Sequence, residues 1–212
     1  MSEKTNVLLI GATGPMGRAV LARNDPRVCV RALARNPQAL AGVADDVVAG
    51  DVRDRDGLVA ALDGIDVVVS CLGSKPFTAD SRDLLEVGTG NLMDAMTRVG
   101  CGRLIVVTGM GAGDSKGHGP WYYDYFARPL ILRTVYADKD RQEEAIRATD
   151  LDWTVVRPSM LVKKTPDKPV RVKAELAPGE KMGPIDRTDV AKFLLAEAVA
   201  PAHSRETVHL YT

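Results

Sequence analysis

The sequence predicts an α/β protein in which helices cover both faces of one mostly parallel sheet. Short apolar runs alternate with longer amphipathic runs along most of the chain. The apolar runs are continuous, which is typical of parallel strands that are buried on both faces. Right-handed crossovers between such strands give a doubly wound sheet. Because 212 residues suffice for one core of this kind, we expect a single domain over 1–212, with a small substrate-side portion over 158–212.

The order of the runs defines the elements up to residue 158. Strands are expected at 7–10, 28–34, 47–50, 65–72, 104–108 and 153–157. Helices are expected from the glycine-rich turn to residue 23 and over 54–62, 80–99 and 137–149. The 80–99 run shows helical spacing at Leu84, Leu85, Leu92, Met96 and Val99. This alternation of strand and helix supports the doubly wound arrangement.

The C-terminal part is less regular. Residues 161–169 are basic and contain proline, so we expect an exposed loop there. A short extra strand is expected at 170–174 and a closing strand at 207–211. Thr188 is a suitable N-cap for a helix over 189–199.

The turn after the first strand carries three regularly spaced glycines. Gly11 permits a tight turn. Gly14 has no side chain, so a pyrophosphate can approach the backbone closely. Gly17 lets the following helix pack close to the sheet. Free amides at the start of that helix then face the phosphates. The sequence therefore predicts a Rossmann-type nucleotide site with the loop residues Gly11, Thr13, Gly14, Pro15, Met16 and Gly17.

The end of the second strand favours NADP(H) over NAD(H). An NAD site usually has Asp or Glu here, which binds the ribose 2′-hydroxyl. This chain has Arg35 instead, and residues 28–40 contain no acidic side chain. A guanidinium favours a 2′-phosphate through paired hydrogen bonds. Asn36 and Arg18 are candidates to assist, whereas a solvated strand end is the alternative for Arg35.

Two further strand ends are expected to line the cofactor, because ligands lie at the carboxyl ends of parallel strands. Asp51 and Val52 follow the third strand, where a carboxylate and a backbone amide can meet adenine. Cys71, Leu72 and Gly73 follow the fourth strand, where a small residue allows close approach of a ribose.

Seven segments together resemble the atypical short-chain dehydrogenase/reductase group, in particular its NmrA-like and biliverdin reductase B/flavin reductase-like members. The segments are GATGPMGR, RALARNP, AGDVRD, VVVSCLG, NLMDAM, RLIVVTGMGAG and LDWTVVRPSML, and they cover nearly the whole chain in order. The resemblance implies NADP(H) bound across the strand ends. It also implies an oxidoreductase that transfers hydride to a flat conjugated acceptor such as a flavin, a quinone or a tetrapyrrole.

The resemblance also assigns catalytic candidates. Family members often carry a serine after the fifth strand, which falls here on Gly109, so Thr108 is the nearest hydroxyl. A threonine that only bonds the backbone is the alternative for Thr108. Lys139 fits the lysine of the family's Tyr-x-x-x-Lys pair, but the position four before it is Val135. Tyr136, three before, lies on the same helix face and can still approach. We therefore take Thr108, Tyr136 and Lys139 as the catalytic candidates.

Other residues are expected around the reacting groups. Pro158 should lie near the nicotinamide, and Met160 is placed to cover it. Tyr122, Tyr123 and Tyr125 are expected to stack on a flat ligand or to cover the core as a surface helix.

Charged residues in two loops offer weaker candidates. Lys163, Lys164 and Lys168 form a basic loop that either attracts an anionic substrate or is simply solvated. His118 titrates in the useful range and is an acid candidate.

Composition argues against several other classes. Lys and Arg together number 28, as do Asp and Glu, so bulk charge favours neither nucleic acid nor an anionic membrane. No apolar run approaches the roughly 20 residues of a membrane-spanning helix. Cys29, Cys71 and Cys101 have neither disulfide nor zinc spacing, so no metal site is expected. The start MSEKTNVLLIG lacks the order of a signal peptide, so we expect a cytoplasmic protein.

Two other functions remain open from the sequence. One is a regulator that binds NADP(H) and reports its redox state without turnover, which the missing serine and the altered Tyr/Lys spacing favour. The other is a sugar-nucleotide epimerase or dehydratase, which the small portion after Pro158 disfavours. The sequence leaves the choice between monomer and dimer open.

Overall fold

The computed structural model describes residues 4–44, 46–74, 77–78, 82–163 and 168–212. Its strands are Thr5–Ile10 (β1), Val28–Ala34 (β2), Asp46–Ala49 (β3), Val67–Ser70 (β4), Arg103–Val107 (β5), Asp152–Pro158 (β6), Leu161–Val162 (β7), Arg171–Lys173 (β8), Ile185–Asp186 (β9) and Glu206–Tyr211 (β10). Its α-helices are Pro15–Leu21 (α1), Arg55–Ala61 (α2), Leu84–Val99 (α3), Arg133–Arg147 (α4) and Arg187–Val199 (α5). Shorter helical segments are Pro37–Leu40 (η1), Gly113–Ser115 (η3) and the π-helical Tyr123–Ile131 (η4).

An eight-stranded sheet forms the centre, in the order β3-β2-β1-β4-β5-β6-β10-β8. Its neighbours are parallel except β8, which pairs antiparallel with β10. Strands β7 and β9 form a separate parallel pair. The strand order reverses between β1 and β4, so this point is the switch at which such sheets bind their ligands. These features confirm the predicted fold class.

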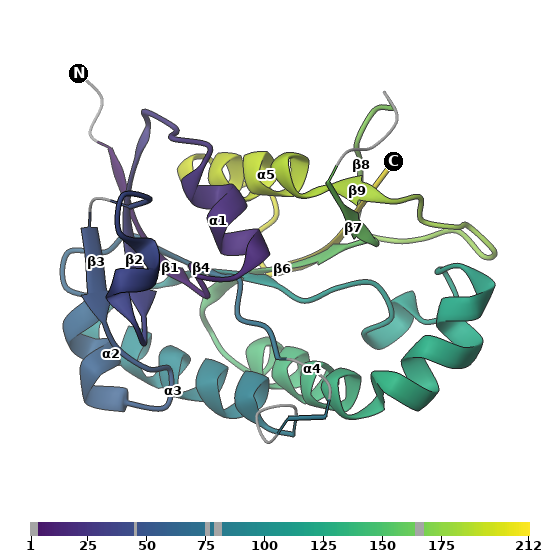
Figure 1. Ribbon diagram of the computed structural model, residues 1–212, viewed down its shortest axis with the longest axis horizontal. Coiled ribbons are helices and arrows are strands. Elements are labelled where there is room, and N and C mark those ends of the chain that lie inside the picture. The colour runs from purple at the N-terminus through teal and green to yellow at the C-terminus, as the bar shows by residue number, and fades with distance from the viewer. Residues whose placement is uncertain (1–3, 45, 75–76, 79–81, 164–167) are drawn as a thin grey trace.

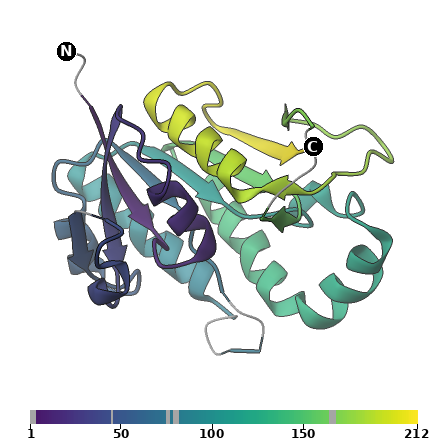
Figure 2. The same ribbon diagram turned by 45° about the horizontal axis from the view of Figure 1, so that its top comes forward.

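The helices form one layer on each face of the sheet. Helices α1 and α5 pack together on one face, and α2, α3 and α4 cover the other (Figures 1 and 2). Strand β1 shows why its apolar run is continuous. Val7 and Leu9 belong to the core on one side of the sheet, whereas Leu8 and Ile10 belong to the core on the other. Each such side chain stabilises the fold by about 1.5–3 kcal/mol through burial.

Helix α5 begins earlier than predicted, and Thr188 is not its N-cap. The Asp186 side chain accepts hydrogen bonds from the backbone N–H and the hydroxyl of Thr188, at 2.7 and 2.8 Å. Asp186 is therefore the N-cap, and α5 starts at Arg187. Both residue types are good N-caps, so their spacing alone could not decide between them.

Helix α4 also starts before the predicted residue 137. It follows η4 almost directly, and its N-cap Leu132 makes no side-chain cap bond. Because no capping side chain marks the start of α4, the sequence alone could not indicate that the helix begins at Arg133.

The remaining corrections are small. The expected loop at 161–169 begins with β7, and its residues 164–167, including Lys164, lie outside the described residues. The extra strand at 170–174 is confirmed as β8. Of the cysteines, Cys29 is exposed on β2 and Cys101 is buried.

None of the helices in the described ranges is long and apolar enough to cross a membrane. The same ranges contain no group of three or more His, Cys, Asp or Glu that could hold a metal ion.

Candidate functional site

The glycine turn between β1 and α1 packs against the end of β4. Gly11 has a φ of +74°, and a Cβ atom there would lie 2.5 Å from the carbonyl oxygen of Cys71. A Cβ atom at Gly17 would overlap the backbone of Gly11. Gly14 donates its N–H to the Gly11 carbonyl at 3.0 Å and precedes Pro15 at the start of α1. Any side chain at Gly11 or Gly17 would therefore displace the turn from the strand ends.

The turn offers backbone groups and few side chains to a ligand. Met16 is buried in the core on the α1 side of the sheet, so its side chain faces away from solvent. Thr13 is exposed, and its carbonyl accepts a hydrogen bond from Arg18 Nε at 3.2 Å. The first turn of α1 contains no acidic residue, so nothing there repels an anion.

The loop after β2 leaves one cation available. Arg35 is exposed and makes no hydrogen bond or ion pair within the described part of the chain. Asn36 is engaged, because its side chain accepts the Gln38 N–H at 3.2 Å. Arg18 connects this loop to the glycine turn by donating to the Ala39 carbonyl at 2.8 Å. Of these three predicted side chains, that of Arg35 is the one with no partner among the described residues.

The ends of β3 and β4 form an apolar wall beside the turn. A Cβ atom at Gly88 of α3 would lie 2.8 Å from the Val52 side chain and 3.2 Å from that of Leu72. Asp51 is half-buried and accepts the Arg53 N–H at 2.9 Å.

Cys71 and Gly73 complete this wall at the end of β4. A Cβ atom at Gly73 would meet no atom of a described residue within 4 Å, so those residues leave space open there. Burial raises the pKa of the Cys71 thiol to about 12, which disfavours the thiolate at neutral pH.

Lys139 and Tyr136 of α4 both approach the turn after β5. A Cβ atom at Gly109 would lie 3.2 Å from Lys139 Nζ and 3.7 Å from the Tyr136 hydroxyl oxygen. Lys139 Nζ donates to the Thr108 carbonyl at 2.9 Å and lies 4.8 Å from the centre of the Tyr136 ring. The Tyr136 hydroxyl donates to the Met110 carbonyl at 2.7 Å. The two predicted residues therefore meet at one point despite their altered spacing.

The Thr108 hydroxyl points away from that point. It donates to the buried carboxylate of Glu143 at 2.7 Å. Arg157 donates to the same carboxylate at 3.1 and 2.6 Å, and its third nitrogen bonds Asp114. Thr108 thus contributes its carbonyl to the Lys139 site, while its hydroxyl belongs to a buried ion-pair cluster.

The charge of Lys139 is sensitive to its surroundings. Removal of the amine from water lowers the pKa of Lys139 to about 8, and the negative charge of Glu143 opposes part of that shift. Near neutral pH the ammonium form still predominates, so Lys139 can donate hydrogen bonds there.

Sequence reasoning missed Tyr123 as a partner of the pair, although it identified the residue as a pocket wall. Its hydroxyl contacts that of Tyr136 and donates to the Met110 carbonyl at 3.1 Å. Glu143 was missed entirely, although its spacing of four residues after Lys139 places both on one helix face.

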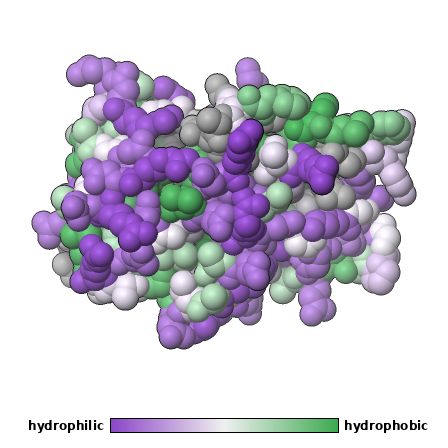
Figure 3. Space-filling view, turned by 90° about the horizontal axis from the view of Figure 1, so that it is seen from below, coloured by the Kyte–Doolittle hydropathy of each residue, from purple (hydrophilic) through white to green (hydrophobic). Residues whose placement is uncertain are grey.

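An apolar surface borders this point. Trp121 is 67% exposed and Tyr125 is 75% exposed, which is unusual for aromatic side chains. Figure 3 shows hydrophobic side chains gathered along one margin of the molecule. The aromatic segment, as we call it, has the exposed apolar residues Trp121, Tyr122, Tyr125, Phe126, Leu130 and Ile131.

Met160, Pro158 and His118 were also predicted to lie near the reacting groups. The Tyr122 hydroxyl reaches Met160 Sδ at 3.8 Å, so Met160 lies beside the aromatic segment. Pro158 is buried at the end of β6, and its carbonyl accepts the Met110 N–H at 2.9 Å. His118 Nδ1 lies 2.7 Å from the Glu180 carbonyl oxygen, so that nitrogen is occupied.

The structure describes two of the three lysines of the basic loop, and both side chains are solvated. Lys163 and Lys168 are exposed and have no hydrogen-bond or salt-bridge partner among the described residues.

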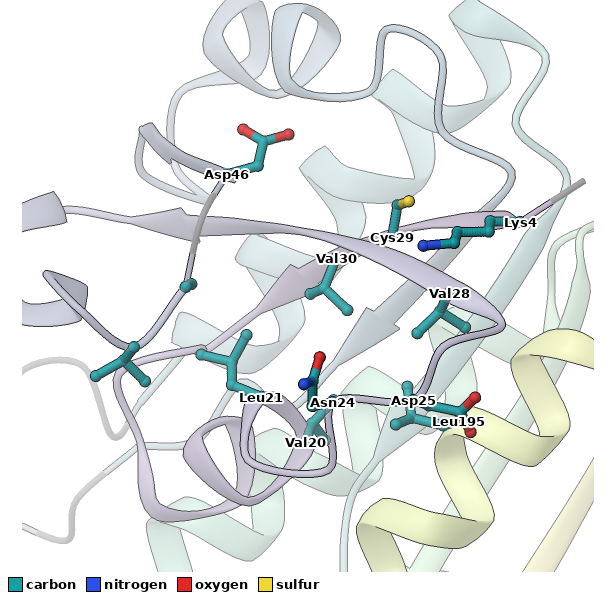
Figure 4. A pocket seen from close by; sticks show the side chains of 12 residues that line it. Lys4, Val20, Leu21, Asn24, Asp25, Val28, Cys29, Val30, Asp46 and Leu195 are labelled. Carbon is teal, nitrogen blue, oxygen red and sulfur yellow. The ribbon is translucent and has the colours of Figure 1, made fainter.

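A cavity of about 340 Å³ lies elsewhere, near the amino end of β2. Val20 and Leu21 of α1 face it across from Val28 and Val30, and Lys4 lies at its margin (Figure 4). None of the predicted site residues lines this cavity.

Comparison with known proteins gives a family and several relatives. Residues 11–201 match the model of the NAD(P)H-binding family. Sterol demethylase protein B of Methylococcus capsulatus is 31% identical in an alignment of 172 residues that covers 73% of this chain and 51% of that protein. The (4-alkanoyl-5-oxo-2,5-dihydrofuran-3-yl)methyl phosphate reductase of Streptomyces griseus is 29% identical over 161 residues, which are 75% of this chain and 49% of that protein. This chain spans about half the length of these curated relatives.

A solved structure matches over nearly the full length. ChuY, an anaerobilin reductase from Escherichia coli O157:H7, is 25% identical and superposes with a TM-score of 0.77. The match covers 98% of this chain and 97% of ChuY.

Proposed function

The chain belongs to the NAD(P)H-binding family, and on that premise we propose that it is an NADPH-dependent reductase of a flat conjugated acceptor. The acceptor classes are flavin, quinone and tetrapyrrole. The observation that carries the proposal is the meeting of Lys139 and Tyr136 at Gly109, at the carboxyl end of β5. The glycine turn follows β1 in the same parallel sheet, so both features lie along one edge.

The residues present fit a nicotinamide dinucleotide. Among the described residues, a Cβ atom at Gly14 would meet only the Gly11 carbonyl oxygen, at 3.3 Å, and one at Gly73 would meet nothing within 4 Å. The pyrophosphate would rest on the amides of the glycine turn. The free guanidinium of Arg35 would bind the adenosine 2′-phosphate, with Asp51 and Val52 beside the adenine.

At the reacting end, the protein supplies position and charge. Bound NADPH supplies the hydride. Lys139 would hold the nicotinamide ribose, because its ammonium is anchored on the Thr108 carbonyl beside Gly109. Tyr136 lies close enough to Gly109 to orient the acceptor or to pass it a proton, while solvent can protonate flavin- or quinone-like acceptors.

The aromatic segment supports a flat and largely apolar acceptor. Tyr123 connects this segment to Tyr136, so a ligand that stacks on Tyr122 or Tyr125 would extend toward the catalytic pair. Contiguous apolar surface of this kind is typical of a binding site. Two relatives are named reductases, which supports a reductase role: ChuY is an anaerobilin reductase, and the Streptomyces griseus relative is a (4-alkanoyl-5-oxo-2,5-dihydrofuran-3-yl)methyl phosphate reductase.

The proposal is tested by NADPH oxidation with a panel of one flavin, one quinone and one linear tetrapyrrole. We expect turnover with at least one acceptor and a preference for NADPH over NADH. No turnover with any of them, combined with tight NADPH binding, would support the sensor described next.

The cofactor preference is tested by Arg35→Ala. Loss of a charge-assisted contact to the 2′-phosphate should weaken NADPH binding about 10- to 100-fold and leave NADH binding unchanged. Fluorescence titration of both cofactors measures this, with Arg53→Ala as a control on the neighbouring loop. Equal loss for both cofactors would contradict the role of Arg35.

A non-catalytic sensor is the second candidate. The hydroxyls of Tyr123 and Tyr136 contact each other and both lie within hydrogen-bond distance of the Met110 carbonyl oxygen, which leaves them less free to act on an acceptor. In that case NADPH would bind with the same preference, and no acceptor of the panel would be reduced.

A further inference from the structure

Glu143 is a buried carboxylate one helical turn after Lys139, and it is 1% exposed. Its oxygens accept hydrogen bonds from Arg157 at 3.1 and 2.6 Å and from Arg147 at 2.9 Å. Burial raises the pKa of Glu143, but the bonds and charge of Arg157 outweigh burial and leave it below its usual value. The residue is therefore a fixed negative charge inside the protein.

Glu143 and Lys139 hold the same residue from two sides. The Thr108 hydroxyl donates to Glu143 at 2.7 Å, and the Thr108 carbonyl accepts from Lys139 Nζ at 2.9 Å. Thr108 follows β5 directly and donates its own N–H to the Val156 carbonyl at 2.9 Å. Two bonds besides that of Lys139 thus fix Thr108, whose carbonyl accepts the hydrogen bond of the Lys139 ammonium.

We propose that Glu143 is a positioning residue for Lys139, because it fixes the Thr108 carbonyl and keeps the ammonium of Lys139 charged. This inference rests on the role of Lys139 in the proposed function. A carboxylate four residues away on the same helix face is near enough for its charge to act. The Arg157 pair prevents Glu143 from taking up a proton itself.

The charge state of Lys139 also depends on the other groups of this region. Arg157 and Arg147 both pair with the Glu143 carboxylate, so both offset part of its charge. The titratable and charged groups facing the cluster are Tyr136, Glu143 and Arg147 on α4, Tyr123 on η4, Asp114 on η3, Arg157 on β6 and His209 on β10.

The test follows the titration of Lys139 by the ¹³Cε shift of its side chain in the protein without cofactor or acceptor. Lys139→Met identifies the signal. Glu143→Gln keeps the shape and removes the charge, so we expect the titration midpoint to fall by about one pH unit. Glu197→Gln removes a similarly buried, arginine-paired carboxylate at the other end of the sheet and should leave the midpoint unchanged. Because neither NADPH nor an acceptor is present, absence of reductase activity does not affect this result.

Two results would overturn the proposal. One is an unchanged Lys139 midpoint in folded Glu143→Gln. The other is an equal shift in Glu197→Gln, which would mean a general effect on the fold.

Thr108→Val tests placement separately and keeps the Glu143–Arg157 pair, so it remains informative if Glu143→Gln does not fold. We expect the affinity for NADPH to fall about 10-fold, because the carbonyl that anchors Lys139 loses one of its supports. Thr108→Ser restores the hydroxyl and should restore the affinity. Wild-type affinity in Thr108→Val would show that Glu143 does not act through Thr108.

Discussion

The central sheet holds a buried arginine–glutamate pair at each end. At the amino end, Arg103 donates to Glu197 at 2.8 Å and to the Thr154 hydroxyl at 2.7 Å. Glu197 also accepts the backbone N–H groups of Ala202 and His203, at 3.0 and 2.9 Å. This pair joins β5 and β6 to the end of α5 and to the loop before β10, and its partners are structural.

At the carboxyl end, Arg157 and Glu143 form a pair of the same chemistry. Both side chains are 1% exposed, and a threonine hydroxyl again completes the pair. Here the threonine is Thr108, whose carbonyl carries the Lys139 ammonium. The two pairs therefore share their chemistry and burial, and they differ in that only the carboxyl-end pair shares a partner, Thr108, with the proposed catalytic lysine.

The largest expected effect tests the structural half of this comparison. Arg157→Met and Arg103→Met each remove the buried arginine from a buried carboxylate, so each should lower the free energy of unfolding by about 3–5 kcal/mol. The loss is expected toward the lower end of that range, because Arg147 still pairs with Glu143 and His203 Nδ1 still lies 2.9 Å from Glu197. Urea unfolding measures both. Arg141→Met is the control, because its pair with Glu86 is 42% exposed on both sides and should contribute about 1 kcal/mol or less. Equal stability of all three variants would contradict the assigned burial.

The second prediction concerns the pH dependence of stability that His209 gives to the carboxyl-end pair. Burial, and then the charge of Arg157, lower the pKa of His209 to about 4, and this residue pairs in register with Arg157. Between pH 4 and the usual histidine value of 6.5, the unfolded chain binds a proton that the folded chain does not. Stability should therefore fall as the pH decreases through this window, by up to about 3 kcal/mol.

Replacement of the histidine provides the check on that window. Urea unfolding of His209→Asn at several pH values should show a flatter dependence than the wild type. A slope identical to that of the wild type would mean that His209 takes up its proton in the folded state.

The third prediction concerns the function that only the carboxyl end has. Lys139→Met should reduce turnover by about 100-fold or more, equivalent to about 2.7 kcal/mol, with the fold intact. Tyr136→Phe should have a smaller effect if solvent supplies the proton. Lys181→Met, on a nearby loop, is the control. Unchanged turnover in both Lys139→Met and Tyr136→Phe would remove the Tyr/Lys mechanism and leave positioning by the pocket.

The fold could be predicted where one local signal was sufficient. Strand β1 is apolar on both faces, and Gly11 and Gly17 are required by close backbone contacts, so periodicity and spacing identified them. Lys139 was identified because its spacing to the segment LDWTVVRP, which contains β6, matches that of the family lysine. These signals lie within short stretches of sequence.

The ion-pair clusters could not be predicted in this way. Arg157 and Glu143 are charged residues on a strand and a helix, and nothing in their local sequence indicates burial. Burial of both depends on how α4 packs on β6, which is a tertiary property. The exposure of the aromatic segment could likewise not be predicted, because tyrosines such as Tyr122 and Tyr125 are as compatible with a core as with a surface.

The smallest expected effect concerns α5, the helix that connects the two ends. Its N-cap Asp186 lies at β9 near the carboxyl edge, and its Glu197 holds the amino-end pair. Asp186→Ala removes the acceptor for the Thr188 N–H and should lower the free energy of unfolding by about 1 kcal/mol. Thr188→Ala loses only the hydroxyl bond, because its N–H still donates to Asp186, and should have a smaller effect. If Thr188→Ala lowered the free energy of unfolding more than Asp186→Ala, then Thr188 and not Asp186 would be the residue that caps α5.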